Sequence, residues 1–306
     1  MTITEKRIEG LQNKVIKLVQ APPRKVPENL PTLHFLKLIV GMRGSGKTNT
    51  MVGIVQKYDK TKSFDFIYIW SPTCRREPKY QHLIDTLKYA KVDLREDFTI
   101  DDFVQVRSDI ELRIEKYKKY ERDMKIWKRF CQYKGDWQSF DDSELLTVFD
   151  EFNYQKPETE FKNGCPTTLL IFDDLQNNKD LFGTLGKAAR IMNNFTVTHR
   201  HFLTSIIWSC QAFKGGGVPK SIRQNISWLI LFSNKSPEIR KEIAKEVCAI
   251  VSPDEFIECW THATRQSRHD FLYLDLEAPD GFQIRKNLDI LLTVKNSDEK
   301  ENNVDK

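Results

Sequence analysis

The feature that most restricts the fold of this chain is an apolar run followed directly by a glycine-rich loop: FLKLIV from Phe35 to Val40, then GMRGSGKT from Gly41 to Thr48. An almost continuously apolar run of this length is typical of a strand that is covered on both faces of a parallel sheet. The loop fits the pattern G-x-x-x-x-G-K-[ST], in which glycines let successive backbone N–H groups turn inward around a phosphate. A helix from about Lys47 to Tyr58 would add the positive end of its dipole. The sequence therefore predicts a strand, a phosphate-binding loop and a helix, in this order.

This loop assigns roles to individual residues of a nucleotide site. Lys47 would reach the β- and γ-phosphates of ATP, and the hydroxyl of Thr48 would ligate Mg²⁺. The residues that we expect to contact the nucleotide are Gly41, Arg43, Gly44, Ser45, Gly46, Lys47, Thr48 and Asn49. An ordinary glycine-rich turn is the alternative, and the position of the loop between a buried strand and a helix argues against it.

A second buried strand, predicted at 167–172, ends in two adjacent acids, Asp173 and Asp174. A nucleoside triphosphate site needs a carboxylate to hold its metal, so we expect Asp173 to organise Mg²⁺ through water. Asp174 is then placed to orient or deprotonate the attacking water. Such a pair points to hydrolysis more than to simple binding, although many hydrolases carry the longer Glu in the second position. A helix N-cap or a turn is the alternative interpretation.

Three further polar residues are candidates for catalysis. Gln211 follows the predicted strand 203–209, where its amide would sense the γ-phosphate or the attacking water; a surface glutamine is the alternative. Arg200 precedes this strand, and Arg223 precedes the next strand, at 227–232. An arginine presented across a subunit boundary would stabilise charge on the transferred phosphoryl group. For either arginine, a structural salt bridge is the alternative.

Strands alternate with helix-length connections along most of the chain, which indicates βαβ units. We therefore predict an α/β fold with a mostly parallel sheet flanked by helices. Besides the strands named above, apolar runs predict a strand at 64–70, helices at about 80–89, 237–249 and 253–263, and strands at about 271–276 and 282–286.

Composition divides the chain into a core and its additions. We expect an N-terminal arm at 1–32, an α/β domain at 33–295 and a polar tail at 296–306. Within the domain, 101–162 is predicted to be a charged helical insertion, and about 235–295 a C-terminal appendage. The charged face of the insertion is compatible with simple solvation or with contact to DNA or a protein partner.

Length and composition exclude other classes of protein. A chain of 306 residues that is 40% hydrophobic can bury a large core, which excludes a disulfide mini-protein and a disordered chain. No apolar run approaches the roughly 18 residues that a membrane span needs. The six cysteines form no Cys-x-x-Cys pair, which argues against a zinc ribbon and a disulfide framework. The formal net charge of +5 is compatible with a polyanionic partner.

Four segments taken together resemble a known family. In order, they are GMRGSGKT, LLIFDDLQNN, HRHFLTSIIWSCQ and VPKSIRQNISWLILF. They are similar to segments of the genome-packaging ATPases of poxviruses, other large double-stranded DNA viruses and virophages, which belong to the FtsK–HerA branch of the additional-strand, RecA-like P-loop ATPases. The resemblance covers about 33–234 and leaves the insertion at 101–162 unmatched.

The resemblance implies a Mg²⁺-dependent ATPase that moves double-stranded DNA into a capsid during virion assembly. It implies ATP bound by the loop, magnesium at Asp173, catalytic support from Asp174, γ-phosphate sensing by Gln211, and a trans-acting arginine with Arg223 as first choice and Arg200 as second. It also implies a homo-oligomeric ring, hexameric or pentameric, a capsid or portal-region partner, and an intracellular location in the host cytoplasm or a viral factory, or association with the virion. Two rival functions are a P-loop kinase acting on a small molecule and a scaffold protein in which nucleotide holds a ring together.

Overall fold

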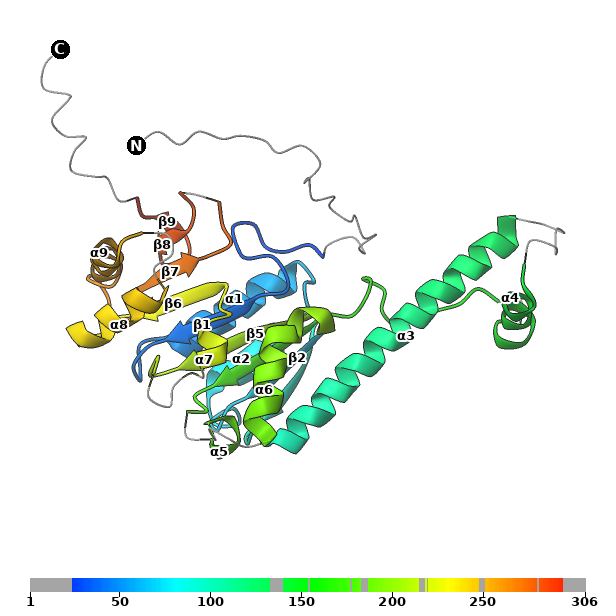
Figure 1. The fold of residues 1–306 in the computed structure, drawn as a ribbon, viewed down its shortest axis with the longest axis horizontal. Helices are drawn as coiled ribbons and strands as arrows, with labels where there is room; N and C mark the ends of the chain where they lie inside the picture. The colour runs from blue at the N-terminus through cyan, green and yellow to red at the C-terminus, as the bar shows by residue number, and fades with distance from the viewer. Residues whose placement is uncertain are drawn as a thin grey trace, which may run out of the picture.

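A computed structural model describes residues 24–132, 140–153, 155–176, 178–182, 187–214, 218, 220–247, 251–279 and 281–293. Most of the predicted arm, 1–23, and all of the predicted tail, 296–306, lie outside the described residues. The described part is built around one nine-stranded sheet with helices on both faces (Figure 1).

The strands follow the spatial order β3-β2-β4-β5-β1-β6-β7-β8-β9. Pairing is parallel from β3 to β6 and antiparallel from β6 to β9, which confirms the predicted mostly parallel sheet. Strand β5 lies between β1 and β4, so an additional strand separates the strand before the phosphate loop from the strand that ends in the acids. The bounds are β1 (Leu36–Val40), β2 (Phe66–Trp70), β3 (Lys91–Arg95), β4 (Thr168–Asp173), β5 (Thr204–Cys210), β6 (Trp228–Phe232), β7 (Phe271–Asp275), β8 (Ile284–Lys286) and β9 (Ile290–Leu291).

Helices cover both faces of the sheet because side chains alternate along each strand. In β1, Leu36, Leu38 and Val40 enter one apolar core, whereas Ile39 enters the other. Helices α1 and α2 pack on the Ile39 face, and α3, α6, α7, α8 and α9 pack on the opposite face. The bounds are α1 (Lys47–Lys60), α2 (Pro78–Thr86), α3 (Ile100–Gln132), α4 (Asp142–Leu146), the π-helix η2 (Thr147–Glu151), α5 (Lys179–Phe182), α6 (Lys187–Thr198), the 3₁₀ helix η3 (His199–Phe202), α7 (Lys220–Arg223), α8 (Pro237–Val247) and α9 (Pro253–Ala263).

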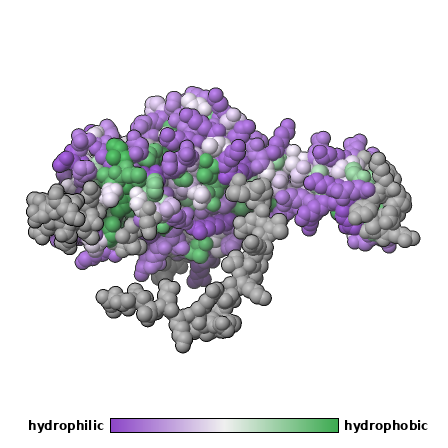
Figure 2. All heavy atoms as spheres, turned by 90° about the horizontal axis from the view of Figure 1, so that it is seen from above, coloured by the Kyte–Doolittle hydropathy of each residue, from purple (hydrophilic) through white to green (hydrophobic). Residues whose placement is uncertain are grey.

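Helix α3 contains the first half of the segment predicted as an insertion, and it has two different halves. Its buried residues, Phe103, Val106, Ile110 and Ile114, all lie in the first half and belong to the core. The second half leaves the body of the protein and carries α4 near its far end (Figure 1). The surface of this projecting half is mostly hydrophilic (Figure 2). No helix in the described part of the chain is both long and apolar enough to cross a membrane.

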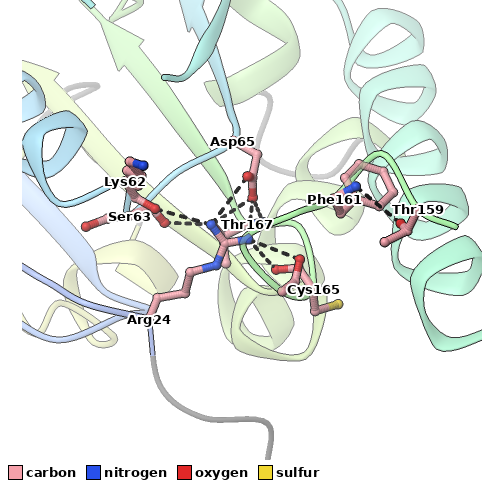
Figure 3. Close-up of polar contacts among 9 residues, drawn as sticks. Arg24, Lys62, Ser63, Asp65, Thr159, Phe161, Cys165 and Thr167 are labelled. Atoms are coloured by element: carbon pink, nitrogen blue, oxygen red, sulfur yellow. Dashed lines mark hydrogen bonds and ion pairs between the residues drawn. The ribbon is translucent and has the colours of Figure 1, made fainter. Parts of the chain in front are cut away.

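The described residues of the predicted arm begin at Arg24, which fastens them to the sheet (Figure 3). Its Nη2 atom donates hydrogen bonds of 2.7 Å to Oδ2 of Asp65 and of 2.7 Å to the carbonyl of Cys165. The same carboxylate accepts a hydrogen bond of 2.8 Å from the backbone N–H of Thr167. These contacts lie where β2 and β4 begin, so the carboxyl ends of the parallel strands are left open for a ligand.

Candidate nucleotide site

The predicted phosphate loop lies at the carboxyl end of β1 and leads directly into α1. The N–H of Gly41 donates to the carbonyl of Cys210, which ties the start of the loop to the end of β5 at 3.1 Å. Gly44 and Gly46 have φ angles of 76° and 108°, in the left-handed region that residues with a Cβ seldom adopt. Gly46 is also the N-cap of α1, so the loop closes on the positive end of the helix dipole.

Lys47 is buried inside the loop and has its ammonium held by the backbone of the loop. Its Nζ donates to the carbonyl of Gly41 at 2.9 Å and to that of Met42 at 3.4 Å. The hydroxyl of Ser45 is buried and has no hydrogen-bond partner in the described part of the chain. A lysine without a carboxylate partner in this loop and an orphaned hydroxyl beside it fit a site for phosphate oxygens.

Asp173, the last residue of β4, meets the phosphate loop through Thr48. Its Oδ2 atom accepts hydrogen bonds from Oγ1 of Thr48 at 3.4 Å and from the hydroxyl of Tyr80 at 2.5 Å. Its other oxygen, Oδ1, is buried and has no hydrogen-bond partner within the described residues. The two segments that were expected to surround one metal–phosphate complex therefore lie side by side.

Burial raises the pKa of Asp173, and the charge of Asp174 raises it further, whereas the hydrogen bond from Tyr80 and the charge of Lys47 lower it. A carboxylate destabilised in this way gains from a nearby cation. Together with the hydroxyl of Thr48, it supplies the hard oxygen ligands that Mg²⁺ prefers. No group of three or more His, Cys, Asp or Glu that would hold a metal is found among the described residues. Mg²⁺ commonly uses one or two protein ligands together with substrate phosphates, so the site fits this ion.

Asp174 and Gln211 form a second pair at the same edge of the sheet. Asp174 has a φ of 54°, and its N–H donates to the carbonyl of Ser209 at 3.1 Å. Its carboxylate accepts hydrogen bonds from Nε2 of Gln211 at 3.2 and 3.3 Å. The backbone N–H of Gln211 in turn donates to Oε1 of Gln176 at 3.2 Å. The structure thus brings together the two residues that the sequence singled out near the reacting phosphate.

The two candidate arginines differ in how they are held. Arg223 donates to Glu246 at 2.7 Å and to the carbonyl of Val218 at 2.6 Å, and its side chain is only 12% exposed. Arg200 lies before β5, at the end of this strand opposite the phosphate loop, and pairs with Glu277 at 2.8 Å. Its side chain is 57% exposed, and an exposed ion pair of this kind stabilises a protein by only about 0–1 kcal/mol. Arg200 is therefore the more exposed and the more weakly held of the two arginines.

Three residues near the loop were missed from the sequence: Tyr80, Arg268 and His269. Tyr80 is separated by 93 residues from Asp173, its partner. Arg268 and His269 are each separated by 224 residues from the loop carbonyls that they contact, those of Gly44 and Ser45. No local sequence pattern predicts these contacts, because each depends on how an element distant in the sequence packs.

Comparisons with known proteins add a fold-level context. No protein-family model matches the sequence, and no match is found among curated proteins. Among solved structures, the chain is similar to the genome packaging NTPase B204 from Sulfolobus turreted icosahedral virus 2 in complex with AMP, with 16% identity and a TM-score of 0.45 over 83% of this chain and 96% of that chain. It is also similar to the monomer form of the pCW3 conjugation coupling protein TcpA with ATPγS, with 12% identity and a TM-score of 0.43 over 80% of this chain and 58% of that chain.

A third similar structure is the cytoplasmic domain of the type VII secretion ATPase EccC from Thermomonospora curvata, with 12% identity and a TM-score of 0.42 over 87% of this chain and 28% of that chain. Genome-packaging NTPases thus occur among the similar structures, as the motif resemblance predicted. At such identities and TM-scores, the function of this chain has to be argued from its own residues.

Proposed function

We propose that this chain hydrolyses ATP with Mg²⁺ at the loop between β1 and α1. The observation that carries the proposal is the contact between Thr48 and Asp173, which joins the phosphate loop to the end of β4. The neighbouring pair of Asp174 and Gln211 adds a carboxylate and an amide at the same edge. The phosphate loop alone would be enough to bind a nucleotide, whereas a second acid, Asp174, supports hydrolysis.

Each of these residues has a chemical task in the proposed reaction. Lys47 would exchange its loop carbonyls for phosphate oxygens of ATP, and the loop N–H groups would hold the remaining oxygens. Thr48 and Asp173 would hold Mg²⁺, which when bound neutralises charge on the phosphates. Asp174 would accept the proton of the attacking water at its carboxylate. Gln211 would keep that carboxylate aimed at the water.

At the level of the assembly, we propose a motor that moves double-stranded DNA during virion assembly, working as a homo-oligomeric ring and attached to a capsid or portal-region protein. The motif resemblance supports this part of the proposal. The exposure of Arg200 favours it over Arg223 as the arginine supplied in trans. The place of action that follows is the host cytoplasm or a viral factory, or the virion itself.

Single-turnover hydrolysis tests the site. Lys47→Ala should lose ATP binding, whereas Asp174→Asn should bind ATP and turn it over very slowly, because only the second change leaves the phosphate contacts intact. Asp59 provides a matched control, because it is buried and its carboxylate accepts hydrogen bonds from the backbone N–H groups of residues 88–90, away from the loop. Asp59→Asn should therefore change stability more than catalysis. Wild-type behaviour of both site variants would refute the assignment.

The rival functions give different results in the same assay. A P-loop kinase would form a phosphorylated small-molecule product, and a nucleotide-dependent scaffold would bind ATP and assemble without turnover. A DNA motor should show an ATPase rate that rises with protein concentration and rises again with duplex DNA. Failure of duplex DNA to change the rate, in a protein that does hydrolyse ATP, would refute the motor but leave the ATPase.

A further inference from the structure

The connection between α9 and β7 lies against the phosphate loop from the side opposite the acids. Nη2 of Arg268 donates a hydrogen bond to the carbonyl of Gly44. Nδ1 of His269 lies 3.0 Å from the carbonyl of Ser45, on the next residue of the loop. A side chain at Gly46 would also meet this imidazole, since a Cβ there would lie 3.2 Å from Nδ1 of His269.

The turn that presents these two side chains is braced by the C-terminal strands. Its next residue, Asp270, accepts hydrogen bonds from Asn287 at 3.1 Å and from the backbone of Ser267 at 3.2 Å. Asp270 also forms an ion pair with Lys286 at 3.4 Å. Because Lys286 belongs to β8, the position of Arg268 over the loop is fixed by the predicted C-terminal appendage and not by the parallel core.

The order of the strands gives the direction in which a nucleotide would lie. Asp173 ends β4, Asp174 follows it, and Gln211 follows β5; all three lie on one side of β1 in the sheet. The strands β6 and β7, and with β7 the turn that carries Arg268, lie on the other side. A nucleotide whose γ-phosphate reaches the acids therefore extends its base and ribose toward β6 and β7.

The two side chains are suited to a nucleoside. Both are exposed, and within the described residues no carboxylate pairs with the guanidinium of Arg268. A planar guanidinium stacks on aromatic rings and offers fixed N–H donors, and an imidazole offers a second flat face. Neither group is needed to hold the loop closed, because the loop already bonds to β5 and to Lys47.

We infer that Arg268 and His269 bind the nucleoside half of ATP in cis, so that the C-terminal strands complete the nucleotide site. This inference rests on the proposed function, because it takes the phosphates to occupy the loop around Lys47. Arg268 acts here as a positioning residue for the substrate and not as a group at the reacting phosphate.

Binding of two ligands tests the inference: ADP, which has a base and ribose, and inorganic pyrophosphate, which has neither. Both are titrated with Mg²⁺ into the full chain by calorimetry, pyrophosphate by competition with ADP. Arg268→Ala should weaken ADP about tenfold, or about 1.4 kcal/mol, and leave pyrophosphate unchanged. Arg268→Lys keeps the positive charge but loses the planar guanidinium, so it should restore little of the lost ADP affinity. Arg265→Ala removes the same charge from an exposed position three residues earlier and should change neither affinity.

The outcomes separate this inference from the proposed function. Equal weakening of ADP and pyrophosphate by Arg268→Ala would show a contact to phosphate, and no weakening of either would show no contact; both overturn the inference and leave the ATPase standing. If the wild-type chain binds neither ligand, or if Lys47→Ala binds ADP as well as the wild type, the proposed site itself fails.

Discussion

Tyr80→Phe tests whether the hydrogen bond from Tyr80 orients Asp173 for binding Mg²⁺. The variant removes one oxygen and keeps the aromatic ring that is packed between α2 and the sheet. That oxygen donates the shorter of the two hydrogen bonds to Oδ2 of Asp173, 2.5 Å against 3.4 Å from Thr48. Burial and the neighbouring carboxylate raise the pKa of Tyr80, so that the phenol stays protonated and donates throughout the accessible pH range.

The expected loss follows from the kind of bond removed. A hydrogen bond to a charged group contributes about 1.5–3 kcal/mol, and loss of an outer-shell partner of a metal ligand commonly costs about 10–100-fold in metal affinity or activity. We expect the Mg²⁺ concentration for half-maximal ATPase activity to rise about tenfold. The hydrogen bond from Tyr80 also lowers the pKa of Asp173, so its loss raises this pKa. Because a protonated Asp173 binds Mg²⁺ poorly, the acidic limb of the pH–rate profile should move to higher pH.

Mg²⁺ titrations of the ATPase rate at several pH values measure both effects. Tyr58→Phe is the matched control, because Tyr58 is also buried and its hydroxyl donates to the carbonyl of Pro31 at 2.8 Å, away from the nucleotide site. This control should lose stability without a change in Mg²⁺ dependence. A folded Tyr80→Phe protein with unchanged Mg²⁺ half-saturation and an unchanged acidic limb would refute the reasoning.

Three further predictions concern a buried lysine, the anchor of the N-terminal arm and the trans-acting arginine. Lys37 is fully buried, its Nζ has no hydrogen-bond partner in the described part of the chain, and burial lowers its pKa well below 10.5. Between that lowered pKa and 10.5, the unfolded chain binds more protons than the folded one, so the free energy of unfolding should rise by up to about 1.4 kcal/mol per pH unit. Denaturant titrations at several pH values measure this slope. Lys37→Met should remove the slope and should have a higher free energy of unfolding than the wild type at neutral pH. Arg24→Ala leaves a largely buried carboxylate unpaired and should lower the free energy of unfolding by about 3 kcal/mol, measured in the same way. The last prediction takes Arg200 to act in trans. Subunits with Arg200→Ala and subunits with Lys47→Ala should each be inactive alone and should regain ATPase activity when mixed, because one kind keeps the phosphate loop and the other keeps the arginine. Arg223→Ala should mainly lower the melting temperature.

The phosphate loop and the acid pair could be predicted because their chemistry is local. Glycines, Lys47 and Thr48 act from one short segment, and Asp173 follows its strand directly. Parallel strands bring their carboxyl ends to the same edge, so Gln211 was also expected there, and the structure pairs it with Asp174. Periodicity and strand topology were enough for this half of the site.

The other half depends on packing that has no local signature. Tyr80 reaches Asp173 only because α2 lies on the same face of the sheet as α1. The strand β3, KVDLR, was not predicted, because it is a half-buried strand at the end of the sheet and carries alternating polar residues instead of an apolar run. Arg268 reaches the loop because β7 pairs antiparallel with β6 and so begins where β6 ends.

The segment predicted as an insertion also shows that packing has no local signature. Its composition is uniformly charged, but only the first half of α3 is packed in the core. The first half of α3 is a core helix: the ring of Phe103 packs against Phe195 at 5.0 Å and against Trp70 at 6.3 Å. The indole N–H of Trp70 donates to Asp102 at 2.8 Å, so a charged residue of the insertion also helps to fix the sheet. Charge alone therefore did not mark where the core ends.

The far half of α3 is stabilised by contacts of its own. An isolated helix is only marginally stable in water, and the buried residues of α3 end at Ile114. Beyond this point the chain returns through η2, where Lys119 pairs with Glu151 at 2.9 Å and the ring of Trp127 packs against Phe152 at 6.4 Å. These contacts join the projecting half of α3 to η2. The projecting part is connected to the sheet in two ways, through the first half of α3 and through the return segment before β4, where the ring of Phe161 packs against Phe66 of β2 at 6.5 Å. The first half of α3 packs through Phe103 on Phe172, the residue before Asp173, so this half joins the projecting part to the strand that ends in Asp173.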